Sequence, residues 1–139
     1  MIEAGSAIIK DNTIKDNYDG IIMITSSPEV FSNKIETNKN SGMMIMKDSR
    51  PKIYSNELIS NNNVGLFVRD NSRFERAGNE KEGIPPKFYF YDNVVDGTDV
   101  ALVVERKISD GKQIVEKNPE LRGECRIPYT FREMRCALI

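Results

Sequence analysis

The residues best suited to acid–base chemistry here are carboxylates, because the sequence has no histidine. A pair of carboxylates can act as general acid and base in glycoside hydrolysis. The acids nearest to such a pair occur in two short segments that also carry Asn and Gly: Asp16, Asp19, Asp92, Asp96 and Asp99. Asp and Asn also stabilise bends by hydrogen-bonding to local backbone. We expect bends at these positions, and we expect the protein not to be an enzyme.

The sequence also offers few residues for metal binding or for nucleophilic catalysis. Structural zinc sites take four Cys or His ligands, and the sequence offers only Cys125 and Cys136. A histidine-dependent triad is excluded because the sequence has no histidine. The segment Asp16–Gly20 lacks the alternating oxygen ligands and the distal Glu of a calcium loop. We therefore expect no metal and no cofactor.

The charge balance argues against nucleic acid as a partner. The 139 residues include 20 basic and 21 acidic side chains, so no net field attracts a polyanion. The N-terminal residues lack the basic and apolar regions of a signal peptide, and no apolar run is long enough to span a membrane. Two cysteines cannot form a disulfide framework, and no Asn-x-Ser/Thr sequon occurs. These features predict a cytoplasmic protein of one domain.

The C-terminal tetrapeptide has the form of a prenylation signal. Cys136-Ala-Leu-Ile follows the C-a-a-X pattern, with Arg132 and Arg135 upstream. Isoleucine is not the usual last residue, and the favoured alternative is that Cys136 stands there by chance or as an apolar capping residue. Membrane association is expected only if Cys136 is prenylated, and then only weakly without a second signal.

A repeat of about 22 residues dominates the sequence. Segments 6–27, 28–49 and 50–71 share an apolar pair, x-Asn-x-Ile/Leu, a second Asn, and then Gly with an apolar run. The first Asn column contains Asn12, Asn33, Asn56 and Asn93, and the second contains Asn17, Asn38 and Asn61, with Thr98 in the fourth segment. The Gly column contains Gly20, Gly42 and Gly65, with Ala101 in the fourth segment. Such a period is typical of a solenoid.

The content of the repeat indicates strands. Apolar residues alternate over short runs, and Gly and Asn interrupt each unit, which disfavours a helical repeat. The predicted fold is all-β: a right-handed parallel β-helix of about four coils with a short irregular or helical C-terminal cap. Stacked Asn side chains would bond across coils and tolerate left-handed backbone, and the Gly column would supply positive φ at a second corner. One inward wall is expected from Ile14, Ile35, Leu58 and Val95, and another from Ile21, Met23, Met43, Ile45, Leu66, Val68, Leu102 and Val104.

Asn33-Lys-Ile-Glu-Thr-Asn38 followed by Gly42-Met-Met-Ile resembles the parallel β-helix repeat of pectate-lyase-like proteins, over residues 6–104. That superfamily includes polysaccharide lyases and hydrolases, periplasmic accessory proteins, F-box proteins with β-helix regions, and the Shc SH2-domain-binding protein group of spindle and cilium. The expected cytoplasmic placement favours the last two types. The combination of Asp pair, Gly-His-Gly and Arg-x-Lys elements found in polygalacturonases has no match here, since the sequence has no histidine, which implies that catalysis is absent.

The remaining segments are expected to decorate or close the stack. Repeats are predicted over 1–104. Residues 72–86 are predicted to form an insertion loop that extends from one corner of the stack over the surface. Residues 105–139 are expected to form a cap, with a weak helical pattern over Ile108–Leu121. The first coil begins within a few residues of Met1, so its edge is expected to be open. We interpret this as a longer β-helix or as end-to-end stacking with another chain, and the alternative is a cap formed by Met1–Gly5 alone.

Strand alternation predicts an apolar stripe on the outside. It consists of Ile22, Met44 and Phe67, with Ile24 and Met46 beside them. We therefore expect a structural or protein-interaction module of a larger complex, with cytoskeletal or axonemal association in view of the resemblance. The first alternative is a carbohydrate-binding or carbohydrate-active protein using aromatics such as Tyr89 and Tyr91. The second is the substrate-recognition part of a ubiquitin ligase, although no F-box-like helical segment occurs in this sequence.

Overall fold

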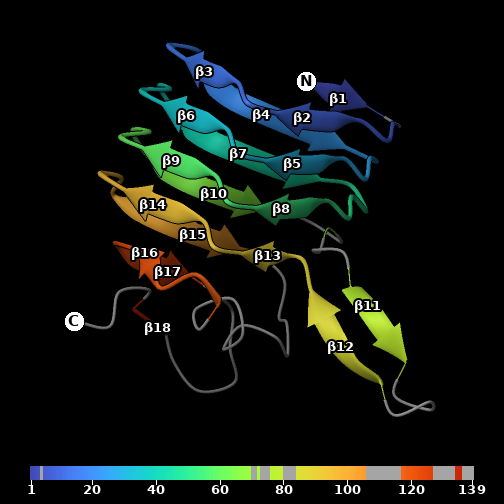
Figure 1. Ribbon diagram of the computed structural model, residues 1–139. Coiled ribbons are helices and arrows are strands. Elements are labelled where there is room, and N and C mark those ends of the chain that lie inside the picture. The colour runs from blue at the N-terminus through green and yellow to red at the C-terminus, as the bar shows by residue number, and fades with distance from the viewer. Residues whose placement is uncertain are drawn as a thin grey trace.

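The computed structural model describes residues 1–3, 5–69, 72, 76–79, 84–105, 117–126 and 134–135. The repeat winds into stacked coils, and each of four successive coils between Ile8 and Val104 contributes one strand to each of three sheets (Figure 1). Sheet A contains β1 (Ile2–Glu3), β4 (Asp19–Ile24), β7 (Ser41–Met46), β10 (Val64–Val68), β15 (Val100–Val104), β17 (Glu124–Arg126) and β18 (Met134–Arg135) in that order. Sheet B contains β13 (Phe90–Tyr91), β8 (Lys52–Tyr54), β5 (Glu29–Phe31) and β2 (Ile8–Lys10). Sheet C contains β16 (Glu120–Leu121), β14 (Val94–Asp96), β9 (Glu57–Ile59), β6 (Lys34–Glu36) and β3 (Thr13–Lys15).

All strands that stack from coil to coil are parallel and nearly in register. In sheet C, Ile14 pairs with Ile35, Ile35 with Leu58, and Leu58 with Val95. Equivalent residues of successive coils therefore lie above one another, as the aligned sequence columns predict. The predicted parallel β-helix is confirmed.

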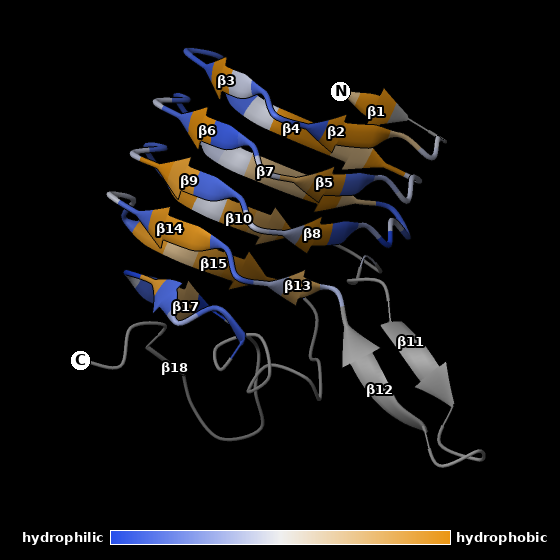
Figure 2. Cartoon of the chain, viewed as in Figure 1, coloured by the Kyte–Doolittle hydropathy of each residue, from blue (hydrophilic) through white to orange (hydrophobic). Residues whose placement is uncertain are grey.

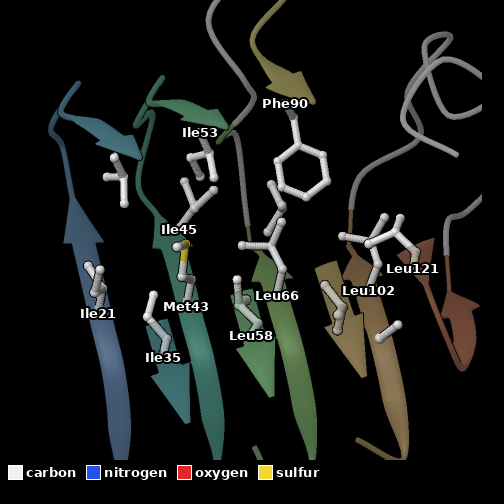
Figure 3. Close-up of a cluster of buried hydrophobic side chains, with 14 of the residues drawn as sticks. Ile21, Ile35, Met43, Ile45, Ile53, Leu58, Leu66, Phe90, Leu102 and Leu121 are labelled. Atoms are coloured by element: carbon white, nitrogen blue, oxygen red, sulfur yellow. The ribbon is translucent and has the colours of Figure 1, made fainter. Parts of the chain in front are cut away.

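The core is a single column inside the three sheets. Side chains from all three walls point into it, and Figure 3 shows Ile21, Ile35, Ile53 and their neighbours meeting there. Both predicted walls are confirmed: every predicted residue is buried except Ile14, which is half-buried at the first coil. The sequence analysis missed the third wall, which sheet B supplies with Ile9, Val30, Ile53 and Phe90.

The two Asn columns form the predicted ladders at the corners that precede and follow sheet C. Asn33, Asn56 and Asn93 are buried in the first ladder, and Asn38 and Asn61 are buried in the second. Asn12 and Asn17, in the first coil, are exposed. Asn118 is a further buried member, because the amides of Asn93 donate to its Oδ1 at 3.0 and 3.1 Å.

Left-handed backbone occurs one residue before each residue of the two predicted Asn columns, and not at the Asn itself. Asp11, Ser32, Ser55 and Asp92 precede the first ladder, with φ between 54° and 57°. Asp16, Thr37, Ser60 and Gly97 precede the second ladder, with φ between 53° and 72°. The Asn side chain then hydrogen-bonds across the bend, as Asn33 Nδ2 does to the carbonyl of Phe31 at 3.0 Å. Hydrophilic residues gather in the bends that follow β3, β6, β9 and β14 (Figure 2).

The Gly column has a different role from the predicted one. Gly20, Gly42 and Gly65 lie within strands of sheet A and do not have positive φ. A Cβ on Gly42 would lie 2.7 Å from the carbonyl oxygen of Gly65 and 2.9 Å from Asn61 Nδ2. Glycine is therefore required because the neighbouring coil and the Asn ladder approach the backbone closely.

A third column of polar residues was missed by the sequence analysis. Ser26, Ser49 and Ser72 are buried at the corner between sheets A and B. The amide of Ser26 donates to Ser49 Oγ at 3.1 Å, and Ser49 Oγ donates to the carbonyl of Met46 at 2.6 Å. Ser49 Oγ thus satisfies backbone groups where its coil leaves sheet A, whereas the hydroxyls of Ser26 and Ser72 are buried without a hydrogen-bond partner among the described residues.

A β-hairpin begins within the excursion predicted at 72–86 and ends at Phe88, two residues beyond the predicted boundary. Strands β11 (Arg76–Asn79) and β12 (Ile84–Phe88) pair antiparallel and leave the stack between β10 and β13 (Figure 1). Beyond the predicted repeat boundary at residue 104, β16 adds to sheet C and β17 adds to sheet A. The weak helical pattern over Ile108–Leu121 falls partly outside the described residues, and its last two residues form β16.

Candidate interaction surface

The predicted apolar stripe lies on the outer face of sheet A. Ile22 pairs with Met44, Met44 with Phe67, and Phe67 with Val103, so these side chains form one row across four coils. All four are half-buried, whereas their sequence neighbours Ile21, Met43, Leu66 and Leu102 are buried in the core. The structure therefore brings Ile22, Met44 and Phe67 together on one outward face.

A second, shorter row runs beside the first. Ile24 pairs with Met46, and both are half-buried on the same outer face. In the third coil this row continues as Arg69, whose guanidinium carbon lies 5.4 Å from the centroid of the Phe67 ring. The same guanidinium pairs with Glu105 at 3.4 Å. The five predicted stripe residues thus form one patch with a cation–π contact and an ion pair at its border.

The outer face of sheet C has a different character. Its outward rows are mainly charged, with Lys34, Glu36, Glu57 and Asp96 among them, and Lys34 pairs with Glu36 at 3.4 Å. Ile59 is an apolar residue within those rows. Charged outward side chains are normal for a strand surface that faces solvent. The apolar outward side chains of sheet A are therefore specific to that face of the molecule.

The outer face of sheet B carries a row of stacked aromatic rings. The ring centroids of Phe31 and Tyr54 lie 5.0 Å apart with planes 3° from parallel, and those of Tyr54 and Tyr91 lie 5.1 Å apart at 4°. Lys52 Nζ lies 4.9 Å from the centroid of Tyr89. Because the rings face one another along the stack, the middle ring presents its edge outward.

Glu29 fixes the centre of this aromatic row. The Tyr54 hydroxyl donates to Glu29 Oε1 at 2.5 Å. That hydrogen bond, together with burial and the charge of Glu29, raises the pKa of Tyr54 to about 12. Burial, followed by the charge of Asp92, raises the pKa of Tyr91.

Most of the candidate acids take part in bends. Asp16 Oδ1 accepts from Thr37 Oγ1 at 2.8 Å, and Asp96 Oδ1 accepts from the amide of Gly97 at 2.8 Å. Asp19 Oδ1 accepts from Asn40 Nδ2 and from both the amide and the hydroxyl of Ser41. Asp92 has left-handed backbone before Asn93, and Asp99 is exposed.

Within the described ranges, no three His, Cys, Asp or Glu residues gather closely enough to hold a metal ion. The described residues also include no helix with the length and apolar character needed to cross a membrane. Both statements concern only the part of the chain that the structure describes.

Cys125 is buried in β17 and is disulfide-bonded. The sequence contains one other cysteine, Cys136, which lies outside the described residues. Lipidation of Cys136 therefore stays a prediction. A disulfide is uncommon in a reducing compartment, so the cytoplasmic placement also stays a prediction.

The comparisons with known proteins identify a family and no individual relative. No curated protein and no solved structure matches the chain significantly. The family model described as "Right handed beta helix region" matches residues 1–103, which agrees with the stacked parallel sheets and the Asn ladders. The chain belongs to the right-handed β-helix family.

Proposed function

We propose that this chain is a non-catalytic module of a larger protein complex. It binds a protein partner through the outer stripe of sheet A, and it makes a second contact through the open edge of its first coil. The observation that carries the proposal is the in-register row of Ile22, Met44, Phe67 and Val103. Contiguous outward apolar area of this kind marks contact surfaces on proteins.

The chemistry of the stripe fits an adaptable protein contact. Met44 and Met46 are flexible and polarizable, which lets one surface fit partners of irregular shape. Arg69 lies at the border of the patch with its charge paired to Glu105. A central apolar area with a polar rim is the usual anatomy of a protein interface.

The resemblance to the Shc SH2-domain-binding and F-box types of β-helix suggests which assembly this is. Under that proposal the module is cytoplasmic and associates with the cytoskeleton or the axoneme. A role in substrate recognition for a ubiquitin ligase would use the same surface, with the ligase contact supplied by other sequence.

Two charge-introducing variants test the stripe. Met44→Glu and Phe67→Glu place carboxylates at the centre of the row, and Ile59→Glu places one at a half-buried position of sheet C. Each variant is expressed in the source cells and sized from the native extract. We expect the wild-type chain and Ile59→Glu to elute in a large complex, and the two stripe variants to elute as free chains. Retention of Met44→Glu and Phe67→Glu in the complex overturns the proposal.

Carbohydrate binding is the second candidate, favoured by the aromatic row on sheet B. Tyr89, Tyr91 and Tyr54 share one outer face with Glu29 and Lys52. A saccharide there would contact ring edges and hydroxyls, because the stack covers the ring faces between neighbours. Tyrosine fluorescence reports on binding, since the chain has no tryptophan. A saturable change with neutral or uronic oligosaccharides that Tyr91→Ala abolishes supports this function, and a flat titration removes it.

A further inference from the structure

Two methionines occupy outward positions of the stripe. Met44 and Met46 lie on β7, and both are half-buried on the outer face of sheet A. On the same strand, Met43 and Ile45 point inward and have no exposed surface. Met23 is also fully buried in the core. A reagent dissolved in water therefore reaches the two outward thioethers of the folded chain and not the inward ones.

Met44 lies at the centre of the first row. Ile22 pairs with it from the preceding coil and Phe67 from the following one, so both flanking side chains in that row are apolar. Neither side chain has a hydrogen-bond donor. An oxygen atom added to Met44 is hydrated while the row faces water, but it loses that water without gaining a donor from the row when a protein covers it.

Met46 lies beside a donor that makes no hydrogen bond. The amide of Arg69 donates to the carbonyl of Ile45 at 2.8 Å, which places Arg69 next to Met46 in the second row. Arg69 Nε is buried and makes no hydrogen bond among the described residues, although Glu105 Oε1 lies 3.4 Å from it. An acceptor introduced at Met46 can therefore take a hydrogen bond from this Nε.

We propose that Met44 and Met46 are a modification site for peroxide, and that their oxidation reversibly prevents the stripe from binding its partner. This rests on the proposed function, because the modification regulates the surface assigned there. A bound partner covers both thioethers. The modification therefore acts on the free chain and keeps it out of the complex.

Each oxidation is a two-electron step. The thioether sulfur bonds to one oxygen of hydrogen peroxide as the O–O bond breaks. The transferred oxygen then gives its proton to the departing hydroxide, so the products are a sulfoxide and water. In the reverse step a dithiol supplies two electrons and two protons, the sulfoxide oxygen leaves as water, and the dithiol becomes a disulfide. Methionine sulfoxide reductases catalyse this reverse step.

Oxidation changes the outer face and leaves the core intact. A sulfoxide is polar where the thioether was apolar. At Met44 its oxygen has only apolar neighbours along the row, so covering it is unfavourable. At Met46 its oxygen accepts from Arg69 Nε, which stabilises the oxidised form of the free chain. The inward side chains of β7 are not modified, so the coil stays folded.

The isolated full-length chain tests the modification itself. It is treated with dilute hydrogen peroxide, and each methionine is followed by peptide mass spectrometry. We expect Met44 and Met46 to react before Met23 and Met43, with an unchanged circular dichroism spectrum. In NMR spectra the Nε–H resonance of Arg69 should move downfield and exchange more slowly with water after oxidation, but not in Met46→Leu. Equal rates at all four methionines, or an unmoved Arg69 resonance, overturn the proposal.

A binding measurement tests the effect on the partner. The oxidised, tagged chain is freed of peroxide, added to an extract of the source cells and sized beside the untreated chain. We expect its share in the large complex to fall about tenfold or more. The share should return after treatment with methionine sulfoxide reductases and dithiothreitol. The double variant Met44→Leu, Met46→Leu should join the complex equally before and after peroxide.

The double variant is a matched control. It keeps the stripe apolar and close to its original volume, and it retains Met1, which is 80% exposed. If peroxide excludes the double variant as strongly as the wild type, the effect lies outside the stripe and the proposal is overturned. If the double variant fails to fold by circular dichroism, recovery of the oxidised wild type with the reductases still decides.

Met44→Glu separates failure of this proposal from failure of the proposed function. If Met44→Glu is excluded from the complex and the oxidised wild type enters it, only the regulation by peroxide is overturned. If both enter the complex, the stripe is not the interface and both proposals are overturned.

Discussion

The backbone amide and the side-chain amide of Asn33 both donate to Oδ1 of Asn56, at 3.1 and 3.0 Å. Both residues are buried, so neither amide can turn to water instead. The side-chain carbonyl of Asn56 therefore satisfies the backbone amide of Asn33, which a tight bend would otherwise leave unpaired. This relationship repeats from coil to coil and sets both the register of the stack and the character of its ends.

The ladder makes a stability prediction. Asn56→Ala leaves the backbone amide of Asn33 without its acceptor and removes one of the three acceptors of Asn33 Nδ2. It also removes the bonds from Asn56 to the carbonyls of Val30 and Tyr54. We expect the free energy of unfolding in urea to fall by about 3 kcal/mol or more. Asn17→Ala, at the exposed first coil, should cost less than about 1.5 kcal/mol. Equal losses for the two variants would contradict the ladder account.

Adding a methyl group to the Gly column should cost more stability than removing one at the equivalent position of the fourth coil. Gly42→Ala places Cβ against the Gly65 carbonyl and Asn61 Nδ2, at 2.7 and 2.9 Å before relaxation. We expect a loss of about 1–3 kcal/mol in the free energy of unfolding. At the equivalent position of the fourth coil the chain already carries Ala101, and Ala101→Gly should cost only about 1 kcal/mol through backbone entropy. Chemical denaturation measures both, and a neutral Gly42→Ala would show that the coils are not so closely spaced.

Inward and outward positions of one strand should respond differently to truncation. Leu58 is 1% exposed, and its neighbour Ile59 points outward on sheet C and is half-buried. Leu58→Ala should lower the free energy of unfolding by about 2–5 kcal/mol, and Ile59→Ala by about 1 kcal/mol or less. The reverse order would mean that the register of β9 is shifted by one residue.

The Tyr54–Glu29 hydrogen bond predicts alkaline sensitivity. The pKa of Tyr54 is about 12 in the folded chain and about 10 in an unfolded one, so folding favours the protonated phenol. Its contribution to stability is fully present below pH 10 and is lost as the pH rises from 10 through 12. Tyr54→Phe should therefore show a smaller fall in its urea midpoint between pH 9 and pH 11.5 than the wild type. The raised pKa of Tyr91 leaves a residual pH dependence in both proteins.

An absorbance titration of the tyrosinate band provides a check that does not depend on unfolding. In the folded wild type one tyrosine should ionise near pH 12, and Glu29→Gln should lower that midpoint, because it removes the charged acceptor. An unchanged midpoint in Glu29→Gln would place the cause of the raised pKa elsewhere.

The repeat itself could be predicted from the sequence because stacking makes equivalent residues visible as columns. Asn33 and Asn56 are the same residue for the same physical reason, and the alternation around Met43 and Met44 identifies inside and outside of sheet A. The outward stripe followed from that alternation alone. In each case the type of side chain fits only one place in the coil, either a bend, the core or the outer face.

Other features had no comparable signal. The left-handed bend residues include Asp11, Ser32 and Ser55, so no glycine marks these bends in the sequence. The Gly column was predicted to supply positive φ, whereas its glycines are required by the close approach of the neighbouring coil. Asn118 was missed because Pro119 follows it and because Asn93 is separated from it by segment 94–117, longer than one regular period. The third wall was missed because short strands such as Phe90–Tyr91 carry only one inward residue each.

Methionine oxidation footprinting tests the central claim, that the stripe of sheet A is covered by a protein partner. Met44 and Met46 point outward and are half-buried, whereas Met23 and Met43 have no exposed surface and serve as internal controls. In the isolated chain, peroxide should oxidise Met44 and Met46 well before Met23 and Met43. In the native complex, Met44 and Met46 should become as slow as the buried pair. Oxidation of Met44 and Met46 at the same rate in the native extract and in the isolated chain would contradict the account.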